Sequence, residues 1–479
     1  MAEDYPFPNI VLITTDQQRG DCTGIDGNPV LETPHLDQLA NEGVYFTRAY
    51  SNCPVCVPAR MVMMTGQTPF NVGCFSNSNQ SLAQKETLPR LLGRLGYQTQ
   101  LIGKGHFSPQ RARLGFDHTL INESGRYREG DDFHRWLQKT PYAGMERDTS
   151  IGNNDVFARR SVLPETHHVN TWTANECRDF IDRRDPTSPF FLWMSFSRPH
   201  SQYDPPAPYD TWYTPDELPV PIEMPSDDFL PPQLCELPKR YDWDRMSRKQ
   251  VLKAKQHYYG QITHIDHQIG RFFAYLRWKG LWDNTLVIFT SDHGDMMGDY
   301  GLFFKSHFFE GSGRVPMILR PPKNWEGVIP AQRFHKPVCL MDILPTFLDA
   351  AGDEVPDHVD GVSLLPALYG EDPIGDRIFH GEIGGETQRH HCLTDGHLKY
   401  MWFRAGGAEF LFDLDSDPQE VNNLAHDPSR VTPWRNRLID LLTARKDAAV
   451  KDGMLQPTPF VPKPESELRA TDPYGRRPY

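Results

Sequence analysis

Long apolar segments and secretion signals are missing from this chain of 479 residues. It contains no run of roughly 18 apolar residues, which excludes an ordinary transmembrane helix. The first residues, Met1 to Tyr5, carry acids and lead almost at once into an apolar strand, without the basic and apolar regions of a signal peptide. We therefore expect a protein with no membrane partner that is cytoplasmic as written, or periplasmic if a leader was removed.

A cysteine-rich disulfide framework and an excess of positive charge are also absent. The 8 cysteines are dispersed and do not resemble the disulfide framework of a small secreted protein. The net charge of −13 argues against nucleic acid as a partner. A small anionic substrate is still compatible with that charge, because a local cluster of cations and metal can override the overall sign.

Apolar runs alternate with amphipathic ones along the chain, and this pattern is typical of an α/β protein. Helices are predicted from Thr33-Pro34, near residues 88–95 and over 247–279. Pro316 lies inside the last predicted strand, so we expect that strand at an edge of the sheet. The predicted strands cover residues 9–15, 98–103, 189–196, 285–290 and 315–319.

This pattern of segments divides the sequence into three parts. Residues 1–372 are expected to form the α/β catalytic domain, and residues 373–455 a smaller subdomain of short antiparallel strands with a helix near 432–447. The proline-rich tail, residues 456–479, is either mobile or an arm that contacts another subunit in a homo-oligomer.

Polar residues follow three of the predicted strands. Asp16 ends the first strand, Lys104 and His106 follow the second, and Asp292 and His293 follow the strand at 285–290. In open α/β sheets, ligands bind outside the carboxyl ends of the strands. The sequence therefore predicts one site at this rim.

Oxygen ligands dominate the predicted rim. The carboxylates of Asp16 and Asp292 with the amide of Gln17 suit a hard divalent cation, Ca²⁺ or Mg²⁺. The imidazole of His293 also admits Mn²⁺ or Zn²⁺. Taken singly, each pair has a simpler interpretation as a strand-end cap or a turn.

The string from Cys56 to Gly66 sets a cysteine in a fixed register with Pro58 and Arg60. A cysteine in an apolar helix start is usually an inert small side chain. Cys53 and Cys56 also form a C-x-x-C pair, so a metal-binding or redox protein without hydrolytic activity remains an alternative. Cys53 lacks the register, because Val55 stands where Cys56 has its proline.

Six motifs follow one another along the chain: Asp16-Gln17, Cys56-x-Pro58-x-Arg60, Gly103-Lys104-Gly105-His106, Pro199-His200, Ser291-Asp292-His293-Gly294 and Gly301 to Lys305. A late pattern consists of Asp417-Pro418, Glu420 and Asn423-Leu424. With these motifs in this order, the chain resembles a type I, formylglycine-dependent sulfatase of the alkaline phosphatase superfamily. The resemblance implies a large mixed, mostly parallel central sheet flanked by helices, with a smaller C-terminal α+β subdomain.

The resemblance also implies roles for these residues. A maturation enzyme would convert Cys56 to formylglycine, whose hydrated aldehyde is the nucleophile beside the metal and Arg60. The metal ligands would be Asp16, Gln17, Cys56, Asp292 and His293, with Ca²⁺ the first choice and Mg²⁺ or Mn²⁺ the next. The other catalytic residues would be Lys104 and Lys305, which hold sulfate, His200, which protonates the leaving alcohol, and His106, which assists release of sulfate.

Two positions depart from the common sulfatase pattern. Gln17 and His293 stand where many sulfatases have Asp and Asn, and they resemble the phosphonate monoester hydrolase branch of the superfamily. The step of 13 residues from Asp292 to Lys305 fits that branch too. Lys104 and His106 favour a sulfate monoester, so phosphonate monoester or phosphodiester hydrolysis is the alternative.

The alcohol part of the substrate is less defined. A sulfated carbohydrate is our first prediction and a small aryl or alkyl sulfate the second. The cluster Arg389-His390-His391 either recognises a substrate carboxylate or a second sulfate, or is an ordinary exposed turn.

Overall fold

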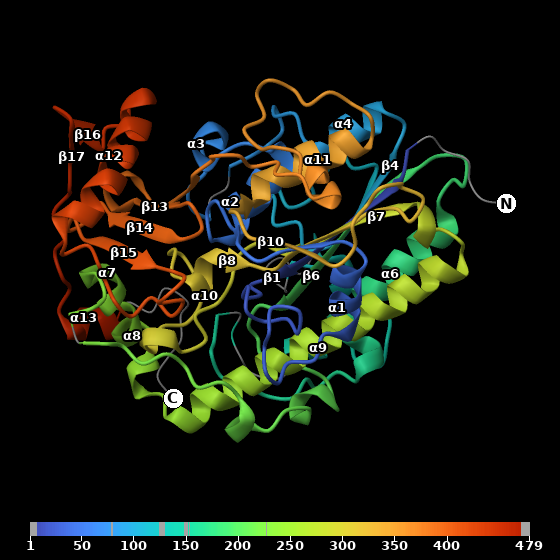
Figure 1. The fold of residues 1–479 in the computed structure, drawn as a ribbon. Coiled ribbons are helices and arrows are strands. Elements are labelled where there is room, and N and C mark those ends of the chain that lie inside the picture. The colour runs from blue at the N-terminus through green and yellow to red at the C-terminus, as the bar shows by residue number, and fades with distance from the viewer. Residues whose placement is uncertain are drawn as a thin grey trace.

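A wide twisted sheet forms the centre of the molecule, and a smaller antiparallel sheet lies beside it (Figure 1). The computed structural model describes residues 7–470 except 78–79, 124–129, 148–151, 153 and 227. The last part of the predicted tail, residues 471–479, lies outside the described residues.

The central sheet has eight strands, and every neighbouring pair is parallel except the two pairs that β9 makes. The predicted mixed, mostly parallel sheet is therefore confirmed. In spatial order the strands are β10 (Gln332–Phe334), β2 (Val44–Phe46), β9 (Met317–Arg320), β7 (Thr285–Ser291), β1 (Asn9–Asp16), β6 (Phe190–Pro199), β4 (Gln98–Gly103) and β5 (His118–Ile121).

The last predicted strand does not lie at an edge. Pro316 separates two strands: β8 (Arg314–Val315) belongs to a small three-stranded sheet with β3 (Ala49–Tyr50) and β11 (Val338–Cys339), and β9 follows. β9 lies inside the central sheet between β2 and β7. The edge prediction was wrong because the proline sits at the junction of two strands, where it interrupts neither ladder.

Helices cover both faces of the central sheet (Figure 1). One face packs against α1 (Pro34–Asn41), α6 (Val169–Arg183) and the predicted long helix, α9 (Arg248–Trp278). The other face packs against α2 (Cys56–Thr65), α4 (Leu88–Arg94) and α11 (Ile343–Ala350). The central strands β1 and β6 carry mainly apolar side chains on both faces, because helices cover both faces of the sheet. Short helices are α3 (Pro69–Val72), α5 (Asp132–Leu137), α7 (Pro232–Cys235), α8 (Leu237–Arg240) and α10 (Glu310–Gly313).

The C-terminal subdomain is a four-stranded antiparallel sheet with one helix, α12 (Pro428–Ala444). Trp434, Leu438 and Leu442 of this helix pack on one face of the sheet. The other face joins the main core, so the subdomain is fastened to the catalytic domain by apolar contacts. Its strands are β12 (Phe379–Ile383), β13 (His390–Thr394), β14 (Leu398–Phe403) and β15 (Glu409–Asp413).

The described part of the tail folds back on its own chain. After the hairpin of β16 (Val450–Lys451) and β17 (Met454–Leu455), the chain runs to α13 (Glu465–Ala470), which packs against α8. The Lys463 amide donates a hydrogen bond of 2.7 Å to the Glu236 carboxylate. Among the described residues, no helix has both the length and the apolar character needed to cross a bilayer.

Candidate active site

Four adjacent strands of the central sheet deliver the predicted rim residues. In the spatial order β7, β1, β6 and β4, their carboxyl ends carry Asp292 with His293, then Asp16, then His200, then Lys104. All five side chains are buried. The sheet topology thus explains how residues far apart in the sequence meet at one edge.

Cys56 approaches this edge as the first residue of α2. Its sulfur lies 3.2 Å from Nε2 of His293, 3.8 Å from Oδ1 of Asp16 and 3.9 Å from Nζ of Lys104. Cys53 has a different environment, and burial raises the pKa of its thiol well above the usual range. All eight cysteines are free thiols, so the structure does not support a Cys53–Cys56 disulfide.

Two buried cations neutralise the two buried carboxylates. Arg60 donates from Nε to Asp292 over 3.0 Å and from Nη1 to the Lys104 carbonyl over 2.6 Å. The Lys104 ammonium contacts Asp16 directly. Arg60 also donates to the Ser195 hydroxyl over 2.9 Å, which fixes the guanidinium in the floor of the site.

Gly103 explains how Lys104 reaches this position. The residue has φ of 106°, and a Cβ built on it would lie 1.8 Å from the Ser195 carbonyl oxygen. No other residue type fits between β4 and β6 at this point. The chain can therefore turn out of β4 and direct the next side chain toward Asp16.

Gln17 and Lys305 lie beside the carboxylates of Asp16 and Asp292. The Gln17 backbone has φ of 73°, a strained conformation for a residue with a side chain, and its N–H donates to Asp292 over 3.0 Å. The Lys305 ammonium contacts the Gln17 side-chain oxygen. The structure thus brings Lys305 to the site from the segment that follows β7.

The two predicted acid–base histidines have different surroundings. His200 is fixed by a 2.7 Å hydrogen bond between Nδ1 and the Ser201 carbonyl. Its pKa lies well below the usual range because of burial, assisted by the positive charges of Lys305 and Lys104. His106 is only partly buried, and its backbone N–H donates to Glu123 over 2.7 Å.

The nucleophile position carries a perturbed thiol. Burial and the Asp16 charge oppose ionisation of Cys56, but Lys104, Lys305 and His293 outweigh them and lower its pKa to about 7. For Asp16, burial is opposed by Lys104, which holds its pKa well below the usual range. This field favours negative charge at the place where a sulfate ester would be attacked.

The ligand set fits a divalent cation. Oxygen, nitrogen and sulfur atoms of Asp16, Cys56, Asp292 and His293 all lie within 4.8 Å of one another, and all four residues are buried. Arg60 and Lys104 balance the two carboxylates, so an added dication with Lys305 would leave net positive charge for an anionic substrate. Two carboxylates and one imidazole are suitable ligands for Ca²⁺, Mg²⁺ or Mn²⁺.

A second group of possible ligands occurs in the C-terminal sheet, where His380, Glu382 and His391 lie close together. Glu382 is already held by two hydrogen bonds from Arg445, of 2.8 and 2.6 Å. Glu382 and His391 are opposite each other on β12 and β13. This arrangement is a cross-strand pair whose acid is neutralised by arginine, so a metal would have to displace that ion pair.

The predicted substrate cluster is divided by the fold. Arg389 lies over the Phe75 ring at 3.5 Å, and its charge is 4.0 Å from Glu382. His391 is fully buried within the subdomain. His390 lines a cleft beside the site and hydrogen-bonds through Nε2 to the Ser306 carbonyl over 2.9 Å. Of the three, His390 is the one that lines this cleft.

That cleft has a volume of about 1220 Å³ and lies beside Cys56, because Val55 and Lys305 form part of its wall. Its other walls come from the loop after α3, from α7 and α8, from the segment between β12 and β13, and from the tail. The residues with side chains useful for binding include Phe75, Asn77, Gln233, Arg240, Gln388, His390, Phe460 and Lys463.

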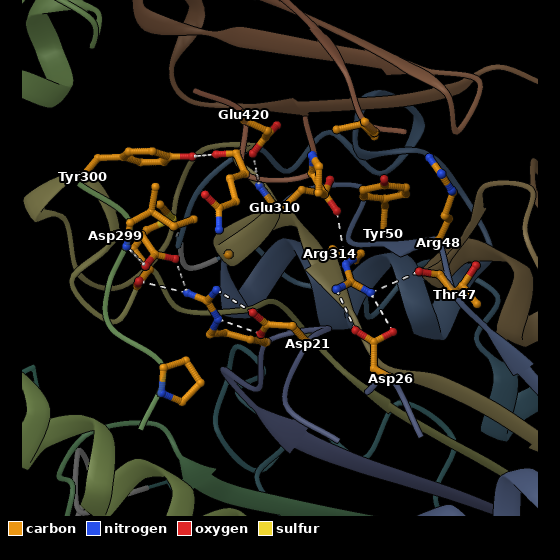
Figure 2. A pocket seen from close by; sticks show the side chains of 18 of the residues that line it. Asp21, Asp26, Thr47, Arg48, Tyr50, Asp299, Tyr300, Glu310, Arg314 and Glu420 are labelled. Carbon is orange, nitrogen blue, oxygen red and sulfur yellow. Dashed lines mark hydrogen bonds and ion pairs between the residues drawn. The ribbon is translucent and has the colours of Figure 1, made fainter. Parts of the chain in front are cut away.

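A second cavity, of about 540 Å³, lies between the catalytic domain and the subdomain (Figure 2). Its charged walls are internally paired: Arg314 donates to Asp26 over 2.9 and 3.1 Å and lies 3.1 Å from Glu310 (Figure 2). Arg19 is likewise held between Asp21 and Asp299. These pairs are structural, and neither Cys56 nor Lys305 lines this cavity.

The late sequence signature also has a structural role. Glu420 is buried, contacts the buried ammonium of Lys399 and accepts a 2.6 Å hydrogen bond from the Glu310 backbone N–H. Lys399 also lies 2.8 Å from the Glu310 carboxylate. This network joins the subdomain to α10, which follows the segment carrying Lys305.

Several supporting residues were not predicted from the sequence. Asp295 accepts hydrogen bonds from Gln17 and from the hydroxyl of Tyr203, and Ser195 contacts Arg60. Asp295 follows His293 by two positions, so its place in the motif was a usable signal. Tyr203 and Ser195 lie near the end of β6 in ordinary surroundings and carried no such signal.

Comparison with known proteins agrees with this site. The sulfatase family profile matches residues 8–353, most of the chain, and a profile described as N-sulphoglucosamine sulphohydrolase, C-terminal, matches residues 298–447. The chain belongs to the sulfatase family. The first match contains every predicted site residue except those of the Arg389–His391 cluster.

Curated sulfatases resemble the chain over nearly its whole length. An arylsulfatase from Clostridium perfringens is 36% identical over 470 residues, which cover 92% of this chain and 95% of the relative. An ulvan-active sulfatase from Formosa agariphila is 30% identical, with 89% of this chain and 79% of the relative covered. These relatives support the prediction of a sulfatase hydrolase.

A solved structure supports the predicted alkaline phosphatase-like fold. The phosphonate monoester hydrolase of Agrobacterium radiobacter matches with a TM-score of 0.79 at 28% identity, covering 92% of this chain and 95% of the other. The superfamily relation seen in Gln17 and His293 thus extends to the whole fold. The family profile and the higher identity to an arylsulfatase favour the sulfatase assignment over the phosphonate alternative.

Proposed function

We propose that this sulfatase removes sulfate from a sulfated carbohydrate, with formylglycine at position 56 and Ca²⁺ as the metal. When in place, the formylglycine would supply a hydrated aldehyde as nucleophile, and the metal would stabilise charge on the sulfate oxygens. The observation that carries the substrate proposal is the cleft of about 1220 Å³ beside Cys56.

The walls of this cleft suit a sugar. Aromatic rings of Phe75 and Phe460 provide faces for a pyranose ring, and amides and charges around them provide hydrogen bonds. Oε1 of Gln233 and Nε of Arg240 are buried without a hydrogen-bond partner among the described residues, so hydroxyl groups of a ligand would satisfy them. A relative from Bacteroides thetaiotaomicron, 26% identical, is named an N-acetylglucosamine-6-O-sulfatase, and its name thus states a sugar sulfate as the substrate.

Side chains around the cluster have separate tasks in this proposal. Lys104 and Lys305 would hold the sulfate oxygens, and Arg60 would keep the Asp292 carboxylate in place. His200 would give its proton to the leaving alcohol. Because its pKa is depressed in the free site, this role requires the negative charge of bound sulfate to raise it.

The type of ligand supports Ca²⁺. Asp16 and Asp292 offer buried carboxylates, and Gln17 offers an amide oxygen. Ca²⁺ takes about six to eight oxygen ligands in a flexible geometry, whereas Mg²⁺ usually keeps several waters and binds through one or two carboxylates and substrate phosphates. A site enclosed by protein side chains therefore suits Ca²⁺ better.

The test is a substrate panel of sulfated mono- and oligosaccharides, nitrophenyl sulfate and a phenyl phosphonate ester. We expect at least one carbohydrate sulfate to give a kcat/KM well above that for nitrophenyl sulfate. A chain that hydrolyses nitrophenyl sulfate but no carbohydrate sulfate would contradict the carbohydrate proposal.

A small aryl sulfate is the second candidate, because the Clostridium perfringens relative is an arylsulfatase. Higher kcat/KM for nitrophenyl sulfate than for every sugar would favour it. Higher kcat/KM for the phosphonate ester than for any sulfate would overturn sulfate preference itself.

A further inference from the structure

Asp295 is a buried carboxylate next to the site that the proposed chemistry does not use. One of its oxygens, Oδ2, accepts a 2.6 Å hydrogen bond from Nε2 of Gln17 and a 2.7 Å hydrogen bond from the hydroxyl of Tyr203. We propose that Asp295 is a positioning residue that orients the Gln17 amide and thereby controls both metal binding and Lys305.

The orientation follows from hydrogen-bond chemistry. An ionised carboxylate only accepts, so the Gln17 group that faces Asp295 is the NH₂ group. The carbonyl oxygen of the same amide must then point the other way. Its neighbour on that side is the Lys305 ammonium, which needs an acceptor. Gln17 thus presents an oxygen, the only kind of atom in its amide that can bind a metal ion such as Ca²⁺.

The second oxygen of Asp295 fixes the segment that carries Lys305. Oδ1 accepts hydrogen bonds from the backbone N–H groups of Met297, at 3.0 Å, and Phe304, at 2.7 Å. Met297 and Phe304 have φ of 48° and 65°, a strained region for side-chain-bearing residues. These two hydrogen bonds hold the two ends of the loop 297–304 together, and this loop ends one residue before Lys305. One carboxylate therefore sets a proposed metal ligand and a proposed sulfate-binding lysine at once.

The substitution Asp295→Asn tests the orientation. The two backbone N–H groups need an acceptor, so they retain the carbonyl oxygen of the new side chain, and its NH₂ group faces Gln17. The Gln17 amide must then rotate and present its own NH₂ group to Lys305 and the metal ligands. We expect the Kd for Ca²⁺, measured by calorimetry on metal-stripped protein, to rise about 10- to 100-fold. The KM for a sulfate ester should rise as well, because Lys305 loses its acceptor.

A reciprocal exchange separates orientation from simple structural damage. In the double variant Asp295→Asn with Gln17→Glu, the new NH₂ group donates to one oxygen of the new carboxylate, and the other oxygen faces the metal. The double variant keeps the net charge of the original pair. We expect it to regain Ca²⁺ affinity to within about threefold of the parent, a recovery that general destabilisation by the first substitution would not allow.

Tyr203→Phe is the matched control, because it removes the other hydrogen bond to the same oxygen of Asp295 and leaves Gln17 in place. Its Ca²⁺ affinity should stay within about threefold of the parent. This variant also keeps the test decisive if Asp295→Asn does not fold, because a tenfold or larger loss in Tyr203→Phe would overturn the proposal.

Two further results contradict the inference. Unchanged Ca²⁺ affinity in folded Asp295→Asn would show that the amide is oriented by something else. Failure of the double variant to recover would show that Asp295 acts only through folding. Because the inference rests on the proposed metal, the parent is titrated first: absence of Ca²⁺ binding by the parent would refute the metal proposal itself, a result distinct from the other two.

Discussion

Cys56 has the surroundings that a nucleophile precursor needs, and Cys53 does not. Cys56 faces His293 and Lys104, which helps lower the pKa of its thiol, whereas burial raises that of Cys53. The two cysteines are close neighbours in the sequence, yet their side chains enter different environments. The comparison shows at atomic level why only one of them suits the proposed chemistry.

The two cysteines give a matched pair of variants. Cys56→Ser should lose multiple turnover, because a serine sulfate has no second hydroxyl with which to release the group. Steady-state hydrolysis of nitrophenyl sulfate and intact mass measure this, with either an inactive or a sulfated protein expected. Sustained turnover by Cys56→Ser would contradict formylglycine chemistry. Cys53→Ala should retain kcat within about threefold, because its thiol lies outside the cluster.

The C-terminal tail forms one wall of the cleft beside Cys56. Phe460 lines the cleft, whereas Met454 of β17 is exposed and lies outside it. Phe460→Ala should raise the KM for a preferred oligosaccharide about three- to tenfold, through loss of one aromatic face. The kcat/KM for nitrophenyl sulfate should change less than about twofold. Initial rates measure both, and equal losses for the two substrates would contradict a role in sugar binding.

Met454→Ala is the control for this prediction. It removes a large side chain from the same C-terminal segment without touching the cleft lining. We expect unchanged KM for both substrates. A rise equal to that of Phe460→Ala would point to loosening of the whole tail.

The Glu420 network joins two elements that are distant in sequence. Glu420→Ala leaves the buried Lys399 ammonium with one carboxylate fewer and frees the Glu310 N–H. We expect the free energy of unfolding to fall by about 3 kcal/mol, as for other broken buried pairs, measured by urea denaturation. Asp415→Ala breaks the more exposed Arg48 pair and should cost less than about 1 kcal/mol. Similar costs for the two variants would contradict this account.

Many of the strands and helices could be predicted from the sequence, and the failures have physical causes. The strand ending at Asp16 was predicted because buried parallel strands are continuous apolar runs. The strand ending at Gly103 is half polar and was predicted as the segment that follows a leucine-rich helix. The position of β9 was not, because strand order depends on contacts between distant segments. Asp295 was overlooked although it directly follows the Ser291-to-Gly294 motif, because nothing in the sequence shows that its carboxylate positions another side chain.

Buried neutral histidines set the acid stability of the whole molecule. Burial lowers the pKa of His264 and His307 to about 3 and that of His257, His380 and His390 to about 4. In the unfolded chain these groups take up protons near pH ~6.5. Unfolding therefore binds protons between about pH 6.5 and pH 4, and stability falls as the pH falls through that window.

We expect Tm to fall steeply as the pH is lowered from about pH 6.5 to pH 4, as measured by calorimetry. His307 offers a single-site check, because both of its ring nitrogens are buried without a hydrogen-bond partner among the described residues. His307→Leu should reduce proton uptake on unfolding by about one proton near pH 5. A Tm that does not change between about pH 7 and pH 5 would contradict the expected linkage.

The burial of Cys56 has a consequence for the order of events in biosynthesis. The side chain is 0% exposed, at the start of α2, and it lies close to Asp16, Lys104 and His293. A maturation enzyme would have to reach Cys56 and the residues around it, and in the finished fold the segment 56–66 is a helix with its C-cap, packed into the core. The proposed conversion would therefore have to precede folding. A molecule that folds first would keep its thiol, and no later encounter with the converting enzyme could activate it without unfolding.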